Sequence, residues 1–299
     1  MRKDFIPSLL IPEIFNPIIN NNNVTADILE RLIPENFYKS FEITTVRKSE
    51  ERKKILELKE KNNLLITQWL TFPLEKHGFD ISSLNRDWKN KSIDFIKKNI
   101  YLGAEAGASN IALVPGENPG LNLIKESSQQ FTESLYDICY EARKFNINIL
   151  IEPLDRNVDK NRLIGPTNEI LDVIKNVKKK YNNIGLAFDT AHAALNGEDI
   201  IKSINMANSE LYQIHFSNAV LEKGHKLFGD RHIPIGNPGF LNIEKISDFL
   251  KKASTISEKT NRKIPIAIEV RTDKNDDLKE KERINREILI KAIKLAEKK

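Results

Sequence analysis

Cysteine is nearly absent from this 299-residue chain, because Cys139 is the only one. A single cysteine excludes an intramolecular disulfide, and its helix-like surroundings, SLYDICYEARKF, indicate that it packs in the core. No apolar run reaches the roughly 18 residues of a membrane-spanning helix. The opening stretch, MRKDFIPSLLIPEIF, is too short in apolar length and too interrupted by proline to be a signal peptide. We therefore expect a cytoplasmic protein with no membrane partner.

Nucleotide-binding signatures are also missing. No G-x-G-x-x-G follows the first strand-like run and no P-loop pattern occurs, which argues against the common nucleotide-binding folds. No linker rich in glycine, serine or proline divides the chain, so residues 1–299 are expected to form one domain. The net charge of +5 is spread along the sequence, and this mild basicity does not favour a nucleic-acid partner.

The chain does contain a regular alternation of strand-like and helix-like patterns. Eight aliphatic runs are predicted to be strands: Phe5–Ile11, Phe41–Val46, Leu64–Leu70, Asn110–Val114, Ile147–Glu152, Ile184–Asp189, Leu211–Phe216 and Ile264–Val270. The predicted helices are Ser49–Asn62, Lys91–Gly107, Ile124–Phe145, Thr167–Lys180, Ile243–Lys252 and Asp276–Lys298. Alternating strands and helices give a parallel sheet, and eight such units predict an α/β fold of the (β/α)8 TIM-barrel type.

Ionisable side chains stand at the ends of four strand runs in the second half of the chain. They are Glu152, Asp189, His215 and Glu269. Each alone is more often a surface group or an ion-pair partner, but all four stand in aliphatic contexts where unpaired charges are seldom buried. The strands of a barrel bring such groups together at their C-terminal ends. This oxygen-rich set suits a divalent ion, with Mn²⁺ preferred and Mg²⁺, Co²⁺ or Zn²⁺ also acceptable.

A divalent ion at this position suggests a reaction. It could chelate adjacent carbonyl and hydroxyl oxygens of a substrate and acidify the C–H bond beside the carbonyl. One carboxylate can take that proton, and a second can return one from the opposite face. The expected activity is isomerisation or epimerisation of a small hydroxy-carbonyl compound through a metal-bound enediolate. A non-catalytic barrel that binds a sugar or a metal is the alternative from another class.

A long connection before the last predicted strand holds a second polar cluster. The segment Ser217–Asn242 is too long for a plain connection, and long loops at this end of a barrel are usually functional. Asp230 and His232 are two residues apart on an extended segment and would face the same side. With His192 they could hold a second ion or the substrate. Alternatively, the segment is a glycine-shaped turn whose polar residues satisfy its own backbone.

These motifs together resemble the xylose-isomerase-like TIM-barrel superfamily, which contains sugar and sugar-phosphate isomerases and epimerases, with endonuclease IV as a divergent member. The matching motifs are Ile151-Glu152-Pro153, Asp189-Thr190-Ala191-His192, His215-Phe216-Ser217-Asn218, the loop from Asp230 to Gly236, and Glu269. The resemblance is clearest between residues 100 and 271. Any one of these motifs alone is weak, and their combination is specific.

The resemblance implies four ligands to the catalytic ion: Glu152, Asp189, His215 and Glu269. It implies that Glu152 and Glu269 form the acid/base pair. It also implies that His192 and Arg231 contact oxygens of a small carbohydrate substrate. Relatives of this superfamily often pair through their helical outer surface, so a homo-oligomer is left open.

Two positions depart from the family pattern. Asn218 stands where many members have aspartate. Asn237-Pro238-Gly239 is one residue longer than the usual sequence after the loop glycine. Either departure could alter substrate preference without removing the ion.

An endonuclease IV-like nuclease is a rival prediction, because its Asp-Arg-His text fits the loop that starts at Asp230. The trinuclear zinc cluster of that enzyme needs histidines on strands three and four. The corresponding runs here, LLITQWL and NIALVPG, contain none, and Val114 occupies the expected position on strand four. His77 lies too far beyond strand three to replace them. The sequence therefore favours the isomerase over the nuclease.

Substrate identity is less sharply indicated. Arg156 and Arg271 follow the strand-end glutamates and could bind a phosphate or carboxylate, or could form ion pairs at the barrel rim. Trp69 could stack on a sugar or pack at the rim. A free ketose, a ketose phosphate, hydroxypyruvate and an inosose all stay open. An inosose-type dehydratase, which is a lyase, uses a similar site and is a further alternative.

Overall fold

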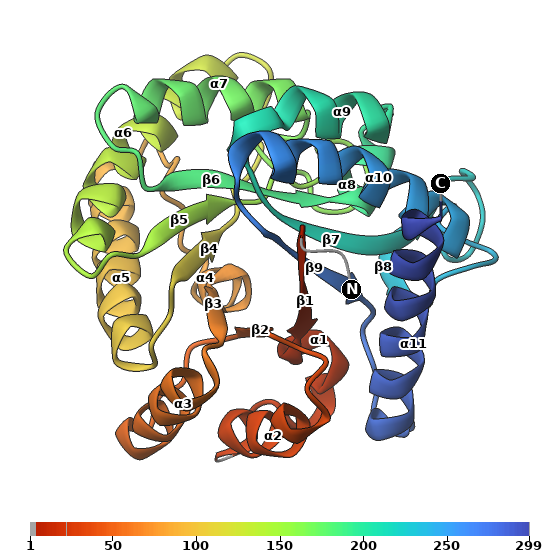
Figure 1. Ribbon diagram of the computed structural model, residues 1–299. Coiled ribbons are helices and arrows are strands. Elements are labelled where there is room, and N and C mark those ends of the chain that lie inside the picture. Colours follow the sequence, from red (N-terminus) through yellow and green to blue (C-terminus); the bar gives the residue numbers. More distant parts are fainter. Residues whose placement is uncertain (1–3, 22, 299) are drawn as a thin grey trace.

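The barrel of this protein is closed. A computed structural model describes residues 4–21 and 23–298 (Figure 1). Its eight parallel barrel strands are β1 (Phe5–Leu10), β2 (Ser40–Ile43), β3 (Leu65–Trp69), β4 (Asn110–Leu113), β5 (Asn148–Ile151), β6 (Ile184–Asp189), β7 (Leu211–Val220) and β9 (Ile264–Glu269). Strand β9 closes the ring between β7 and β1, with Phe5 opposite Ile264 and His215 opposite Ala267. The predicted (β/α)8 TIM barrel is confirmed.

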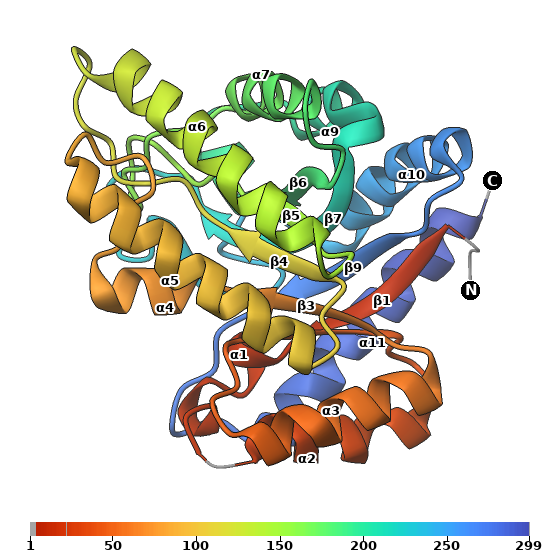
Figure 2. The ribbon, with the colours of Figure 1, turned by 90° about the vertical axis from the view of Figure 1, so that its left-hand side faces the viewer.

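Helices surround the barrel (Figures 1 and 2). They are α1 (Ile11–Ile14), α2 (Val24–Leu32), α3 (Ser49–Asn62), α4 (Thr71–His77), α5 (Arg86–Glu105), α6 (Ile124–Arg143), α7 (Thr167–Lys178), α8 (Thr190–Leu195), α9 (Ile200–Ala207), α10 (Ile243–Thr260) and α11 (Leu278–Glu297). Short 3₁₀ turns occupy Asn16–Ile18, Ile33–Glu35 and Asn208–Glu210. Within the described residues, none of the helices combines the length and the apolar character that crossing a membrane requires.

The sequence patterns predict the longer helices and miss the short ones. Helices α1, α2, α4, α8 and α9 have four to nine residues, too few for a clear helical periodicity. Helix α10 also continues eight residues past its predicted end at Lys252. That extension is rich in serine and threonine, which are weak helix formers. It is held because the buried hydroxyls of Ser254 and Ser257 donate to the Asp4 carboxylate and to the Arg262 carbonyl, at 2.6 and 2.8 Å.

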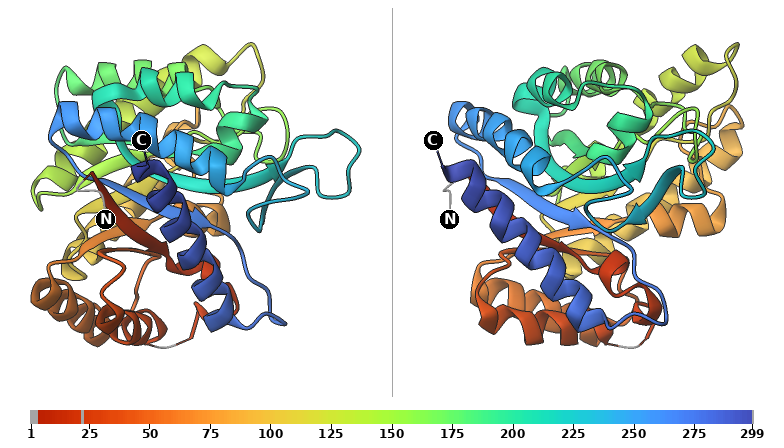
Figure 3. Two further views of the ribbon diagram at one scale, coloured as in Figure 1. Left: turned by 45° about the vertical axis from the view of Figure 1, so that its right-hand side comes forward. Right: turned by 90° about the vertical axis from the view of Figure 1, so that its right-hand side faces the viewer.

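Strand β8 (Gly229–Ile233) is not predicted by the sequence patterns. It pairs antiparallel with the end of β7, with Asn218 opposite Ile233 and Val220 opposite Gly229. Strand β7 therefore continues past the predicted end at Phe216, and the two strands form an arm that extends from the barrel (Figure 3). Asp230 and His232, two of the polar residues that indicate a loop in the sequence, lie buried on the inner face of this arm.

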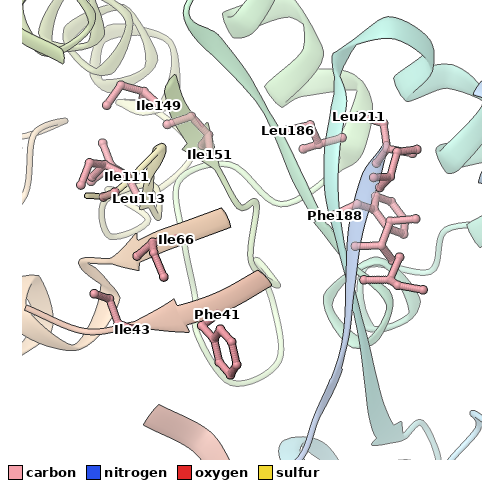
Figure 4. Close-up of a cluster of buried hydrophobic side chains, with 14 of the residues drawn as sticks. Phe41, Ile43, Ile66, Ile111, Leu113, Ile149, Ile151, Leu186, Phe188 and Leu211 are labelled. Carbon is pink, nitrogen blue, oxygen red and sulfur yellow. The ribbon is translucent and has the colours of Figure 1, made fainter. Parts of the chain in front are cut away.

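Alternation along the strands separates two apolar regions. Outward residues such as Ile111, Ile149 and Phe188 join the main core between the sheet and the helices (Figure 4). The residues between them face the barrel interior, where Leu10, Trp69, Ala112, Leu150 and Ala187 form a much smaller cluster. Buried polar side chains such as Glu42, Gln213 and His215 share this interior with the small apolar cluster.

Candidate metal centre

Four side chains from four strands meet at the C-terminal end of the barrel. One donor atom each from Glu152, Asp189, His215 and Glu269 lies within 4.8 Å of the other three. Glu152 directly follows β5, Asp189 ends β6, His215 lies in β7 and Glu269 ends β9. The register places Asp189 opposite His215 on the neighbouring strand. All four residues are buried, so their charges have little access to water.

The two oxygen atoms of the Asp189 carboxylate have different surroundings. Its Oδ1 caps helix α8 by accepting hydrogen bonds from the backbone N–H groups of Ala191 and His192, at 2.8 and 2.9 Å. Its Oδ2 is buried without a hydrogen-bond partner. The Nδ1 atom of His215 is likewise buried without one. Because buried polar atoms are rarely left without partners, these two atoms point to a ligand that accepts lone pairs.

His215 is oriented by a residue that the sequence patterns do not single out. The Glu42 carboxylate, on β2 and fully buried, lies 2.8 Å from Nε2 of His215. The same Oε2 atom accepts hydrogen bonds from Trp69 Nε1 at 2.7 Å and from Gln213 Nε2 at 2.6 Å. A proton on Nε2 of His215 satisfies Glu42 and leaves the Nδ1 lone pair free for a metal. Nδ1 lies 3.3 Å from Glu152 and 3.1 Å from Glu269.

The electrostatics of the cluster fit a cation. Burial raises the pKa of Asp189 well above its usual value, and the neighbouring carboxylates raise it further. Burial also raises the pKa of Glu152. The effect of burial on Glu269 is outweighed by His232 and His215, which hold the pKa of its carboxyl well below the usual range. A divalent ion would favour the ionised form of all three carboxyl groups, and three carboxylates with one imidazole suit Mn²⁺, Mg²⁺, Co²⁺ or Zn²⁺.

A second cluster adjoins the first. Alternation along β8 turns Asp230 and His232 inward, as expected, and Asp230 Oδ2 lies 3.2 Å from His232 Nε2 and 3.8 Å from His192 Nε2. His232 Nδ1 lies 3.1 Å from Glu269 Oε1, which connects the two clusters. Burial would lower the pKa of His192, but Asp230 and Asp155 raise it to about 9. This group can therefore present a positive charge to substrate oxygens or to an anionic ligand.

The loop after β5 supports the second cluster. Asp155 is fully buried and accepts hydrogen bonds from the N–H groups of Val158, Asp159 and Lys160, while its Oδ2 lies 3.4 Å from Nδ1 of His192. Lys160 in turn lies 3.4 Å from the Asp230 carboxylate. The loop after β5 and the arm of β7 and β8 are thus connected across the site.

The structure does not bring every predicted residue to the site. Arg231 lies on the opposite face of β8, where it is exposed and pairs with Asp159 at 3.2 Å. Arg156 pairs with Glu169 and also donates to a backbone carbonyl, away from the cavity. Arg231 faces away because side chains alternate along a strand. Arg156 is held by the carboxylate that lies beside it at the barrel rim.

Trp69 and Arg271 do line the cavity above the metal centre. The Trp69 ring lies 4.9 Å from the His215 ring, centre to centre, and its N–H is already used by Glu42. Arg271 binds the Glu13 carboxylate through two nitrogen atoms, at 2.6 and 2.8 Å. This cavity has a volume of about 1210 Å³, and three of the four candidate ligands, Glu152, His215 and Glu269, line it.

Comparison with protein families gives a match over most of this fold. The description "xylose isomerase-like TIM barrel" matches residues 35–296. The chain belongs to the xylose isomerase-like TIM barrel family. The resemblance drawn from the motifs is therefore confirmed. Comparison with curated proteins gives no match.

Solved structures share the fold of this xylose isomerase-like barrel at low identity. A D-tagatose 3-epimerase-like protein has a TM-score of 0.68 and 19% identity, covering 96% of this chain and 97% of that chain. D-psicose 3-epimerase with D-tagatose from Clostridium cellulolyticum H10 has a TM-score of 0.67 and 16% identity, covering 91% and 92%. The IolI protein with a bound zinc atom has a TM-score of 0.67 and 14% identity, covering 97% and 96%.

Asn218, which departs from the family pattern, has a structural role in this family member. Its side-chain amide donates to the carbonyls of Pro234 and Gly236, at 2.7 and 2.8 Å, and its oxygen accepts from the N–H of Leu241 at 2.8 Å. An aspartate could not make the two donated bonds. Asn218 therefore uses its side chain to hold the loop that follows β8.

Several buried residues around the site are missed by the sequence patterns, above all Glu42, Gln213 and Asp155. One signal for Glu42 is present, because a charged residue interrupts the aliphatic strand Phe41–Val46. A buried charge needs partners, and such an interruption therefore indicates a polar interior. The identity of those partners depends on strands that are distant in the sequence.

Proposed function

We propose that this protein is a divalent-metal-dependent isomerase or epimerase of a small sugar, sugar phosphate or related hydroxy-carbonyl compound, with Mn²⁺ as its ion. The observation that carries the proposal is the position of two glutamates on either side of one metal-facing nitrogen. Glu152 Oε1 and Glu269 Oε2 lie 3.3 and 3.1 Å from Nδ1 of His215. Their strands are three places apart around the barrel, so the two carboxylates approach the site from different directions.

The residues would divide the work as follows. Glu152, Asp189, His215 and Glu269 would hold the ion, which when bound polarises a carbonyl oxygen and acidifies the adjacent C–H bond. One glutamate takes the proton from that carbon, and the other returns a proton from the opposite side. His192 and His232 face the same cavity, and His192 Nε2, which lies 3.8 Å from Asp230, donates to a further oxygen of the substrate.

The neighbours in fold support a carbohydrate substrate. Two of them are described as a D-psicose 3-epimerase with D-tagatose and a 3-keto-D-glucoside 4-epimerase, and the IolI structure holds zinc. Their chemistry requires proton transfer next to a carbonyl, which is the reaction that paired glutamates suit. A nuclease site has less support, because Trp69 and Val114 stand at the ends of β3 and β4. His77 packs its ring against Phe95, at 5.3 Å.

Proton exchange in D₂O tests this proposal. The Mn²⁺-loaded protein would be incubated with free ketoses, ketose phosphates, hydroxypyruvate and inososes, and after removal of the ion the C–H signals would be followed by proton NMR. We expect metal-dependent loss of the signal next to the carbonyl, and no loss in chelator. Loss of water from an inosose instead would assign the site to a dehydratase.

Substitution of the two glutamates tests the mechanism. Glu152→Gln and Glu269→Gln should each slow exchange by on the order of 10²–10⁴-fold, because each removes a proton carrier. Circular dichroism should show that both variants fold. Glu57→Gln is the matched control, since Glu57 is exposed on α3 and does not line the cavity. Turnover near that of the wild type in either site variant would refute the proposed mechanism.

A further inference from the structure

The cavity is larger than a simple hydroxy-carbonyl compound requires. Its volume of about 1210 Å³ exceeds the roughly 300–1000 Å³ of ordinary small-molecule pockets. Beyond the metal centre it continues between the loop that follows β2, helix α4 and helix α5. Helices α4 and α5 lie side by side at this part of the barrel (Figure 2) and are joined by contact between the His77 and Phe95 rings.

Four basic residues line this outer part, and we call them the basic wall: Arg47, Lys48, Lys76 and Lys98. All four are exposed. Among the described residues, none of their charged groups has a carboxylate within the 4.0 Å of an ion pair, and what distinguishes these four is that they line one cavity. The basic wall is therefore a concentration of uncompensated positive charge inside a cavity.

Three further acidic residues line the cavity, and among the described residues each has a partner outside the basic wall. Glu51 accepts hydrogen bonds from the N–H groups of Thr25 and Ala26. Glu75 pairs with Arg162, and Glu13 binds Arg271. An anion that enters the outer cavity thus meets free cations and occupied carboxylates.

The backbone that carries the basic wall is held in place. Arg52 donates to the carbonyls of Val46 and Arg47, at 3.0 and 2.5 Å, and its guanidinium also pairs with Glu105 at 2.8 Å. The Thr45 hydroxyl donates to the Asn99 side chain at 2.6 Å, which fastens the loop after β2 to α5. Binding of an anion here would order lysine and arginine side chains without the cost of ordering the loop.

We propose that the basic wall binds the phosphate group of a phosphorylated substrate whose hydroxy-carbonyl end lies at the metal centre. This inference rests on the proposed function and narrows its substrate class to sugar phosphates. A phosphomonoester carries roughly −1.5 to −2 charges at neutral pH, which matches several cations better than a single carboxylate would. One cavity is lined both by the metal centre and by the basic wall, so a single ligand can enter both parts of it.

A selectivity assay tests the proposal. For the Mn²⁺-loaded protein, kcat/KM for proton exchange would be compared between a pentulose 5-phosphate and the free pentulose, and between a hexulose 6-phosphate and the free hexulose. We expect the phosphorylated compound to be preferred. In the double variant Arg47→Gln/Lys98→Gln, that preference should fall at least about tenfold, since charge-assisted contacts are lost.

The double variant Lys53→Gln/Lys97→Gln is the matched control. It removes the same charge from the same neighbourhood, on α3 and α5, but neither lysine lines the cavity. The preference should stay within about twofold of the wild type, as expected for surface charges. A wild-type preference for free ketoses, or an equal loss in both double variants, would overturn the proposal.

A binding measurement separates this proposal from the proposed function. The ³¹P signal of each ketose phosphate would be recorded with Mg²⁺-loaded protein, where binding broadens the line without any turnover. If the wild type broadens the line and the Arg47→Gln/Lys98→Gln variant does not, the basic wall binds the phosphate. This result would stand even if no proton exchanges, because lack of exchange would reject only the isomerase activity. Proton exchange on free ketoses without ³¹P broadening would support the isomerase activity and reject phosphate binding by the basic wall. Cleavage of DNA with an abasic site that depends on Arg47 and Lys98 would assign the wall to a polynucleotide and overturn it.

Discussion

Replacing Glu42 with glutamine removes one negative charge beside the metal centre and keeps the shape of the side chain. Glu42 is fully buried, and its Oε2 atom accepts hydrogen bonds from Trp69 and Gln213 and faces Nε2 of His215, at 2.6 to 2.8 Å. Its Oε1 atom accepts from the Ser8 hydroxyl at 2.8 Å. A glutamine can place its oxygen at the Oε2 position and turn its NH₂ toward Ser8, whose hydroxyl can also accept.

The expected magnitude follows from these contacts. A hydrogen bond to a charged group contributes about 1.5–3 kcal/mol and a neutral one about 0.5–1.5 kcal/mol, so three weakened bonds amount to ~3 kcal/mol. The carboxylate's larger burial cost offsets part of this, and we expect the free energy of unfolding to fall by about 1–2 kcal/mol. Metal affinity should fall about 10–100-fold, because His215 keeps its tautomer but loses the charged partner that raises its basicity.

Calorimetric titration with Mn²⁺ and urea denaturation in chelator measure the two effects separately. Glu282→Gln is the control, since Glu282 is also a buried carboxylate and accepts a hydrogen bond from Tyr38 at 2.8 Å, but it lies on α11 and does not line the cavity. That variant should lose stability but keep its metal affinity. If Glu42→Gln binds Mn²⁺ as the wild type does, Glu42 does not tune His215 and the reasoning is refuted.

Two further predictions concern the metal and the β8 arm. Mn²⁺ at 100 times its dissociation constant should raise the free energy of unfolding by about 2.7 kcal/mol. Asp189→Asn should lose this gain in stability. In chelator the variant should be at least as stable as the wild type, because it relieves repulsion among the carboxylates and keeps the helix cap. Thermal unfolding with and without Mn²⁺ checks both statements, and a variant that is less stable than the wild type in chelator would contradict the second. Gly229→Ala should cost about 1–3 kcal/mol and displace β8, since Gly229 has a φ of +101° and an added Cβ would lie 1.9 Å from the Asp159 carboxylate. Gly224→Ala has a similar φ of +92° but no atom within 4 Å of the added Cβ, so an equal loss in both variants, measured by urea denaturation, would show that the contact with Asp159 is unimportant.

The fold was largely predictable from local patterns. Long aliphatic runs separated by amphipathic stretches predict the eight barrel strands and the longer helices, because burial of those faces dominates their free energy. Pro7 does not break the first strand, because β1 uses its two ends for different neighbours and the Pro7 carbonyl still accepts a hydrogen bond from Lys39. The β8 arm was not predictable, since Gly229 to Ile233 is polar and pairs only because β7 extends beyond the barrel.

Some features of the site were also predictable from the local sequence, and others were not. The positions of Glu152, Asp189, His215 and Glu269 at strand ends are a local property of the sequence, and closure of the barrel then brings them together. Whether a neighbouring arginine serves the site is not local. Arg271 faces the cavity and Arg231 faces away because strand register and alternation decide it.

The sequence by itself determined which residue types stand at the ends of which strands, and hence the family and the donor set of the candidate metal centre. Tertiary structure decided everything that depends on convergence. Glu42 meets His215 although 173 residues separate them in the chain, and the basic wall gathers side chains from a loop and two helices around one cavity. The physical reason is range: burial and periodicity act over a few residues, whereas hydrogen-bond partners and electrostatic fields are set by distances in space.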